Sequence, residues 1–142
     1  MRFENDDPSH RKALIKALDS AGLNASEFNS GGGIMHVLVP LIDPYSDSGI
    51  SSAENPETAQ KTATYLKKCK EEASLYIATG SAASNCDIGF IGNDGCGNQV
   101  ESPVWEHAET LDDAINIFLK QWQERDYWLQ EFIEGKLSLT RN

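Results

Sequence analysis

The sequence predicts an α+β fold, a two-layer sandwich in which a small, mainly antiparallel sheet of three or four strands packs against helices. Three observations favour it: two helix-start signals, a β-branched apolar segment, and a C-terminal amphipathic pattern long enough for the longest helix of the chain. A chain of 142 residues is long enough to bury a substantial core. We therefore expect residues 1–142 to form a single globular domain.

Two helices in the first half of the chain are predicted from their starts. An Asp-Pro pair at 7–8 and an Asn-Pro pair at 55–56 each place a capping side chain directly before a proline, which the first turn tolerates. Apolar residues then recur at spacings of three or four, as on the buried face of an amphipathic helix. These patterns predict helices over 8–21 and 56–72.

The strands are predicted from short apolar runs. Residues 34–42 are β-branched and apolar apart from His36 and Pro40. Because Pro40 has no N–H, we expect that end of the strand at a sheet edge or at the end of pairing. Two more strands, and a third that closes a hairpin after an Asn-Asp-Gly turn, are predicted at 75–79, 86–91 and 99–101. The Asn- and Ser-rich segment before residue 34 is expected to be a loop.

The longest predicted element is a helix from Thr110 to Ile133, with a start that resembles a capping box. One apolar stripe along it is wide enough to pack on a sheet. This core stripe consists of Leu111, Ile115, Phe118, Leu119, Trp122, Leu129 and Ile133. By helical phase Asp126 also falls in the stripe and Arg125 lies at its edge. Either the helix no longer packs on the core at these positions, or Arg125 and Asp126 belong to a partly buried ion pair.

A second line runs beside the core stripe of this helix and consists of Ala114, Ile117, Gln121, Trp128 and Phe132. Aromatic side chains off the core face are typical of surfaces that contact partners. We therefore predict an interface made of Ile117, Gln121, Trp128 and Phe132. The simplest partner is a second copy of the chain, since symmetric homodimers are the commonest assemblies. The alternative is that another segment of the same chain covers these side chains.

The charge of the chain narrows the classes of partner. Asp and Glu number 22 against 12 Lys and Arg, for a net charge of −10, and residues 101–134 carry nine of the acids and two of the bases. This balance argues against direct nucleic-acid binding, which needs clustered cations. No apolar run is long enough for a membrane span. The acidic N-terminus and the three cysteines, an odd number, lead us to expect a cytoplasmic protein.

Glycine-rich segments suggest a ligand site as an alternative function. The glycines at 31–33 precede a strand and are not followed by Gly-Lys, so they do not match a phosphate-binding loop. With a lysine patch and a tyrosine they still suggest a site for a small nucleotide-like ligand. Its predicted residues are Gly31, Gly32, Gly33, His36, Tyr76, Lys67, Lys68 and Lys70.

No metal, cofactor or catalytic set is predicted. Residues 43–54 depart from a calcium loop at its third and sixth positions. The spacings among Cys86, Cys96, His107 and His36 match no zinc motif. A thiol set of Cys86, His36 and Asp87 is conceivable, but core packing explains Cys86 better, since it shares a strand face with apolar residues.

These observations favour a non-enzymatic, acidic interaction protein of inhibitor or adaptor type that acts as a homo-oligomer. One alternative is a domain that binds or sequesters a nucleotide-like ligand. Another is a nucleic-acid mimic whose acidic C-terminal half blocks a basic cleft. An enzyme of unrecognised type stays open, because sites assembled from distant segments leave little trace in a single sequence.

Overall fold

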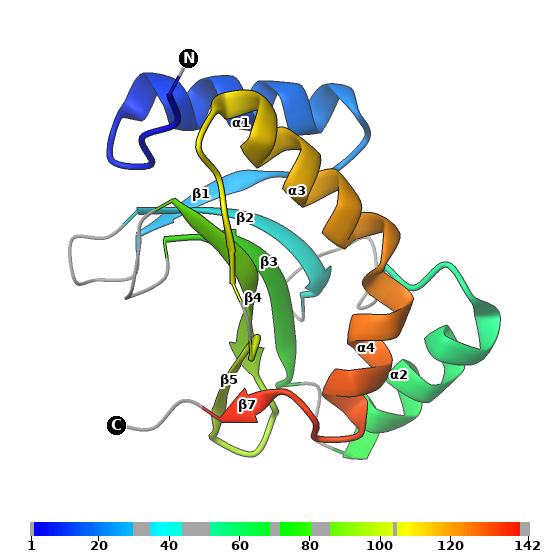
Figure 1. Cartoon of the computed structure of the whole chain (residues 1–142). Helices are drawn as coiled ribbons and strands as arrows, with labels where there is room; N and C mark the ends of the chain where they lie inside the picture. The colour runs from blue at the N-terminus through cyan, green and yellow to red at the C-terminus, as the bar shows by residue number, and fades with distance from the viewer. Residues whose placement is uncertain are drawn as a thin grey trace. The chain divides into compact units, whose positions relative to one another are not determined.

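The computed structural model confirms the α+β class (Figure 1). It describes residues 2–29, 35–43, 52–68, 72–80, 86–103 and 105–139. Within these residues the helices are α1 (Pro8–Ser20), α2 (Pro56–Lys68), α3 (Leu111–Gln123) and α4 (Arg125–Ile133). The strands are β1 (Ser26–Asn29), β2 (Met35–Ile42), β3 (Ser74–Thr79), β4 (Asp87–Asn93), β5 (Gln99–Glu101), β6 (Glu106–His107) and β7 (Ser138–Leu139).

The sheet is open and mainly antiparallel, as predicted, and it packs against helices. The expected size of three or four strands is wrong. Six strands follow the order β1-β2-β3-β4-β5-β7, and β6 pairs with β4 outside this path. Three of the strands were not predicted. β6 and β7 have only two residues each, and β1 is mostly polar, so none of them produces an apolar period.

Both helix starts in the first half are confirmed, and side-chain caps explain them. Oδ1 of Asp7 accepts a hydrogen bond from the N–H of Ser9 at 2.9 Å, and Oδ1 of Asn55 accepts one from the N–H of Glu57 at 2.8 Å. These bonds satisfy amides that have no partner inside the helix. α1 and α2 therefore begin at the predicted prolines.

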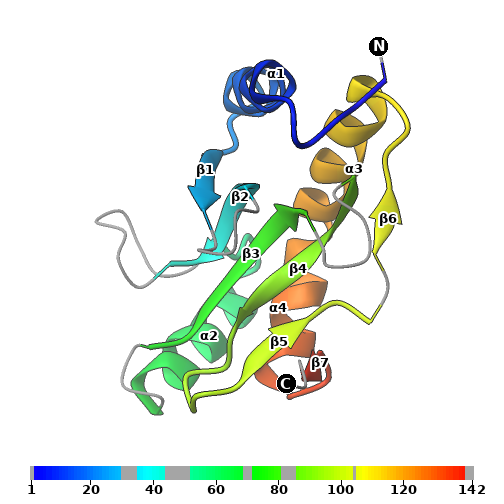
Figure 2. The ribbon, with the colours of Figure 1, turned by 90° about the vertical axis from the view of Figure 1, so that its left-hand side faces the viewer.

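Contacts divide the chain into two compact units. Unit 1 comprises Met1–Val39, Ile77–Gly89 and Val104–Trp122, and unit 2 comprises Pro40–Tyr76, Phe90–Pro103 and Gln123–Asn142. The core of unit 1 includes the fully buried side chains of Phe3, Leu14, Leu18, Val37, Ile77, Ile88 and Phe118. That of unit 2 includes Leu41, Ile42, Leu66, Leu75, Phe90 and Leu129. In unit 2, α2 and α4 lie side by side (Figure 1 and Figure 2).

The single long C-terminal helix is a wrong prediction, because the helix is interrupted at Glu124. That residue has φ −90° and ψ 9°, and it separates α3, which belongs to unit 1 up to Trp122, from α4, which belongs to unit 2. A helical wheel drawn with one continuous phase therefore misassigns the buried face. Within the described chain, no helix is long and apolar enough to cross a membrane.

The buried residues of α3 and α4 come from both of the predicted stripes. Phe118 and Leu129 of the core stripe are buried, but the other five members of that stripe are only half-buried. The remaining buried positions are Ala114, Gln121 and Phe132, all from the second line. Most of the second line is thus part of the cores of the two units.

Candidate functional site

An exposed aromatic side chain on the edge strand of the sheet is the first feature of the candidate site. Phe28 is 51% exposed and lies in β1, where it pairs in register with His36 of β2. The two rings are stacked, with centroids 6.3 Å apart and an interplanar angle of 29°. Figure 2 shows β1 beside β2 in unit 1. Phe28 therefore presents a ring that is supported on one side and accessible to solvent.

The orientation of His36 is fixed from the opposite side by β3. Its Nδ1 lies 2.6 Å from the backbone carbonyl oxygen of Thr79. A carbonyl only accepts hydrogen bonds, so Nδ1 carries the proton. In the neutral ring, Nε2 is then the nitrogen that accepts a hydrogen bond. Gly80 makes this approach possible, since a Cβ there would lie 3.0 Å from Nδ1, and its φ of +84° also favours glycine.

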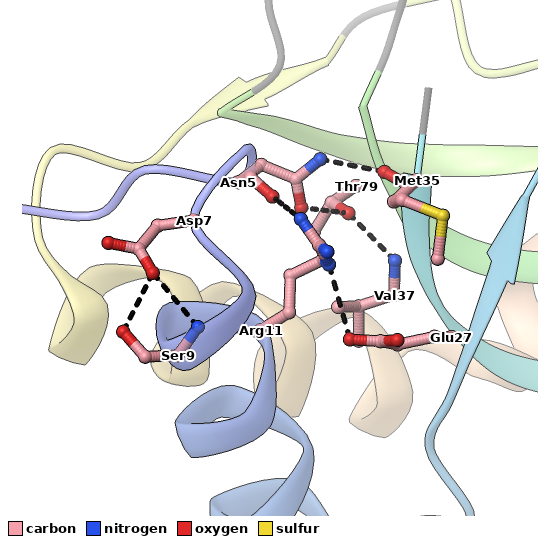
Figure 3. Close-up of polar contacts among 8 residues, drawn as sticks. All are labelled: Asn5, Asp7, Ser9, Arg11, Glu27, Met35, Val37 and Thr79. Carbon is pink, nitrogen blue, oxygen red and sulfur yellow. Dashed lines mark hydrogen bonds and ion pairs between the residues drawn. The ribbon is translucent and has the colours of Figure 1, made fainter. Parts of the chain in front are cut away.

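A buried polar network supports this end of the sheet (Figure 3). The Thr79 hydroxyl donates to Oδ1 of Asn5 at 2.8 Å and accepts from the N–H of Val37 at 2.9 Å. The Asn5 amide Nδ2 donates to the carbonyl of Met35, also at 2.8 Å. Asn5 and Thr79 are 1% and 0% exposed, and the two bonds of the Thr79 hydroxyl form away from water. Such a network holds β2 and β3 in one arrangement, because an unpaired polar group in the interior is costly.

Arg11 connects this network to β1. Its Nη1 donates to the carbonyl of Asn5 at 2.6 Å, and its Nε donates to the Glu27 carboxylate at 3.2 Å (Figure 3). The Arg11 side chain is 8% exposed and that of Glu27 is 36% exposed. The only acidic residue of β1 is therefore neutralised locally by a nearly buried guanidinium.

The backbone of β1 has one side turned away from the sheet. The N–H of Val37 points to β3, since it donates to Thr79. Backbone groups of successive strand residues point to opposite sides, so those of His36 point to β1 and those of its partner Phe28 point to β2. The N–H and C=O of Glu27 then point outward. All four residues of β1 are exposed, and β1 ends the strand order.

The four predicted interface residues are used largely within the chain. Gln121 is 4% exposed, and its Nε2 donates to the carbonyl of Ile88 at 3.2 Å and to the Glu106 carboxylate at 2.9 Å. Phe132 is 3% exposed and its ring meets that of Tyr65 edge-on at 5.6 Å.

Ile117 and Trp128 are half-buried. The Trp128 ring packs 4.8 Å from that of Phe90 and 5.1 Å from that of Tyr127. Packing inside each unit explains three of the four predicted interface side chains, the exception being Ile117, and Gln121 and Phe132 expose too little surface for a partner.

The predicted ligand residues do not gather in one unit. His36 belongs to unit 1, whereas half-buried Tyr76 and exposed Lys67 and Lys68 belong to unit 2. The glycines at 31–33 and Lys70 lie outside the described residues. Among the members of this set that the structure describes, only His36 takes part in the site at β1.

The remaining polar candidates form separate contacts in unit 1. Nδ1 of His107 lies 2.8 Å from Oδ1 of Asp87, and the Cys86 thiol donates to the carbonyl of Phe3 at 3.2 Å. His36 instead contacts Thr79. Among the residues that the structure describes, no group of three His, Cys, Asp or Glu side chains is placed to hold a metal ion.

Strand β1 and Phe28 were missed by the sequence reasoning. Four residues with one apolar side chain do not form an alternating pattern, so the segment resembles a loop. The Ser-Gly-Gly-Gly sequence at 30–33 was a usable signal. A glycine-rich connection before a strand is typical of a hairpin, which would have indicated a preceding strand at the position of β1. Comparison of the chain with family models, curated proteins and solved structures finds no match.

Proposed function

We propose that this protein is a non-enzymatic interaction protein, of inhibitor or adaptor type, that acts as a homo-oligomer and uses the edge of β1 as its contact surface. The observation that carries the proposal is Phe28, 51% exposed on an edge strand whose four residues are all exposed. Aromatic side chains dominate the energetics of many interfaces. An edge strand also offers backbone groups that pair with a strand of another chain.

Local charge supports self-association at this surface. A net charge of −10 disfavours contact between two copies over most of their surfaces. At β1 the Glu27 carboxylate is paired with Arg11, and the other three residues of the strand are uncharged. The repulsion is therefore reduced at the place where the aromatic side chain is exposed.

Sedimentation analysis over a concentration series tests the proposal. We expect the wild-type chain to sediment as a dimer at high concentration and as a monomer on dilution. Phe28→Ala should weaken the association about tenfold or more, since removing an interface anchor typically costs above 1.4 kcal/mol. Tyr127→Ala is the matched control, because Tyr127 is 59% exposed in unit 2 and should leave the association unchanged. A wild-type chain that stays monomeric throughout contradicts the proposal.

Trp128→Ala separates this surface from the interface expected on the C-terminal helix. The Trp128 ring packs against Phe90, so the substitution should lower stability without changing the association constant. If Trp128→Ala weakened the association more than Phe28→Ala does, the contact surface would lie on α4 and not on β1.

As a second candidate, we propose a small-molecule-binding domain in which His36 contacts the ligand. The observation that favours it is the hydrogen bond from Nδ1 of His36 to Thr79, because it directs Nε2 to act as the acceptor of the neutral ring. A ligand with an N–H or O–H donor and a planar ring would use both Nε2 and the Phe28 face.

Native mass spectrometry of the protein from its host tests this candidate. His36→Gln is the variant and His10→Gln is the control, since Nε2 of His10 lies 3.6 Å from the Asp7 carboxylate, away from β1. The candidate predicts a bound mass that only His36→Gln removes. A clean apo mass for the wild type, with no thermal shift from a panel of nucleosides, would contradict it.

A further inference from the structure

We propose that two copies of this chain join through antiparallel pairing of β1 with β1, in the register that places Phe28 opposite Phe28 of the second copy. The inference rests on the proposed function and specifies its partner and geometry. It follows from three features of β1: the direction of its backbone groups, the position of its one charge, and the exposure of Phe28.

The backbone direction limits the possible registers. Antiparallel strands exchange hydrogen bonds between residues whose N–H and C=O point toward the partner. In β1 the backbone of Glu27 points outward, and by alternation that of Asn29 lies on the same side. A symmetric pair of β1 strands is therefore centred on one of the four residues of the strand, Ser26, Glu27, Phe28 or Asn29.

The charge of Glu27 and the length of β1 select among these four centres. Centring on Glu27 would place two carboxylates directly opposite each other, which is destabilising. Centring on Ser26 or on Asn29 would place Glu27 opposite residue 25 or residue 31, each of which lies beyond an end of β1. Centring on Phe28 places Glu27 opposite the uncharged Asn29 in both halves of the pair. This register alone keeps the pairing inside β1 and separates the carboxylates.

The selected register also brings the exposed ring to the centre of the interface. Phe28 would form a non-hydrogen-bonded pair with its symmetry mate, the kind of pair in which side chains approach most closely. Its ring is 51% exposed in the single chain and is supported by His36 behind it. Contact between the two rings would remove apolar surface from water without a new charge contact.

A second copy is the occupant that this strand fits, because a symmetric contact needs a surface that is complementary to itself. With Phe28 at the centre, Phe28 meets Phe28 and Glu27 meets Asn29 on both sides of the axis. The Arg11 guanidinium neutralises Glu27 within each copy, so pairing requires no cation from elsewhere.

Disulfide trapping tests the register. In a background with Cys69, Cys86 and Cys96 changed to Ser, a mixture of the Glu27→Cys chain and the Asn29→Cys chain should form a covalent heterodimer with oxidised glutathione. This design keeps the Phe28 ring in place, and the register puts residue 27 opposite residue 29, where cross-strand Cβ atoms are about 4.5–5.5 Å apart. Each variant alone is the matched control and should form little homodimer. A dominant homodimer of one variant would overturn the register in favour of pairing centred on that residue.

Sedimentation of the uncrosslinked background chain distinguishes the two levels of failure. If this chain dimerises but the mixture of the Glu27→Cys and Asn29→Cys chains does not crosslink above the level of either variant alone, the register is wrong while self-association stands. If the background and the wild-type chain are both monomeric at every concentration, the proposed function fails together with the register, and a second copy is excluded as the occupant of the β1 edge.

Discussion

Asp126 and Asn55 are joined by a 2.9 Å hydrogen bond from the backbone N–H of Asn55 to Oδ2 of the Asp126 carboxylate. The other carboxylate oxygen accepts from the N–H of Glu54, also at 2.9 Å. Beside it, Arg125 donates to the carbonyl of Ser52 at 2.7 Å. The first turn of α4 thus holds the segment that leads into α2, while Asn55 caps α2 with its own side chain.

Replacing Asp126 should destabilise unit 2. Asp126→Ala removes the acceptor of two amides at the start of α2, and we expect the free energy of unfolding to fall by about 1–2 kcal/mol. Urea denaturation measures the change. Glu124→Gln is the control, because Glu124 makes no capping hydrogen bond with its side chain, and it should have almost no effect. Equal losses in the two variants would contradict the capping role of Asp126.

The parts of the fold that are predictable from the sequence are those with a local signal. The starts of α1 and α2 follow from an Asp or Asn before proline, and β2 follows from its apolar, β-branched residues. Pro40 lies just beyond Leu38, the last residue of β2 that pairs with β1, as expected for a residue without an N–H.

The parts that were missed depend on contacts between distant segments. The helical wheel places Asp126 among core positions, but no local signal indicates that its partners are amides more than 70 residues earlier. The interruption at Glu124 shifts the phase of the wheel for α4, where Phe132 is buried although an exposed line was expected. Gln121 precedes the interruption, and its burial accompanies hydrogen bonds to Ile88 and Glu106, which are distant in sequence. In β1, pairing with β2 creates the strand, since four mostly polar residues have little strand preference of their own.

Gly92 should tolerate no side chain, for a steric reason. A Cβ at this position would lie 2.1 Å from the backbone carbonyl oxygen of Ser74, so Gly92→Ala requires β3 or β4 to shift. We expect a loss of about 3 kcal/mol or more in thermal or urea unfolding. Gly97→Ala is the comparison, because nothing lies within 4 Å and only its φ of +91° is unfavourable, which costs about 1 kcal/mol. A Gly92→Ala variant as stable as Gly97→Ala would be incompatible with this packing.

The Thr79 hydroxyl should matter more than the volume of its side chain. Thr79→Val keeps the shape but leaves the N–H of Val37 and Oδ1 of Asn5 unpaired in the interior, with an expected loss of about 2–3 kcal/mol. Thr79→Ser keeps both hydrogen bonds and loses one methyl group, which costs about 1 kcal/mol. Chemical denaturation of both variants decides the point, and the reverse order of stability would show that packing outweighs the network.

Glu106 should make stability depend on pH in the acid range. Partial burial raises the pKa of its carboxyl group, but hydrogen bonds from Lys120 at 2.7 Å and Gln121 at 2.9 Å outweigh this, so the pKa lies below its ordinary value of 4.5. A lowered folded-state pKa contributes stability that is present above the unfolded pKa and is lost as pH falls through the folded one. Glu106→Gln should therefore be less stable than the wild type at pH 7, and the difference should shrink as pH falls below about 4.5. Thr79→Ser is the control, because it removes no ionisable group and its deficit should stay constant over this pH range. A Glu106→Gln deficit that persists undiminished at pH 3 would show that the carboxylate charge is not the cause.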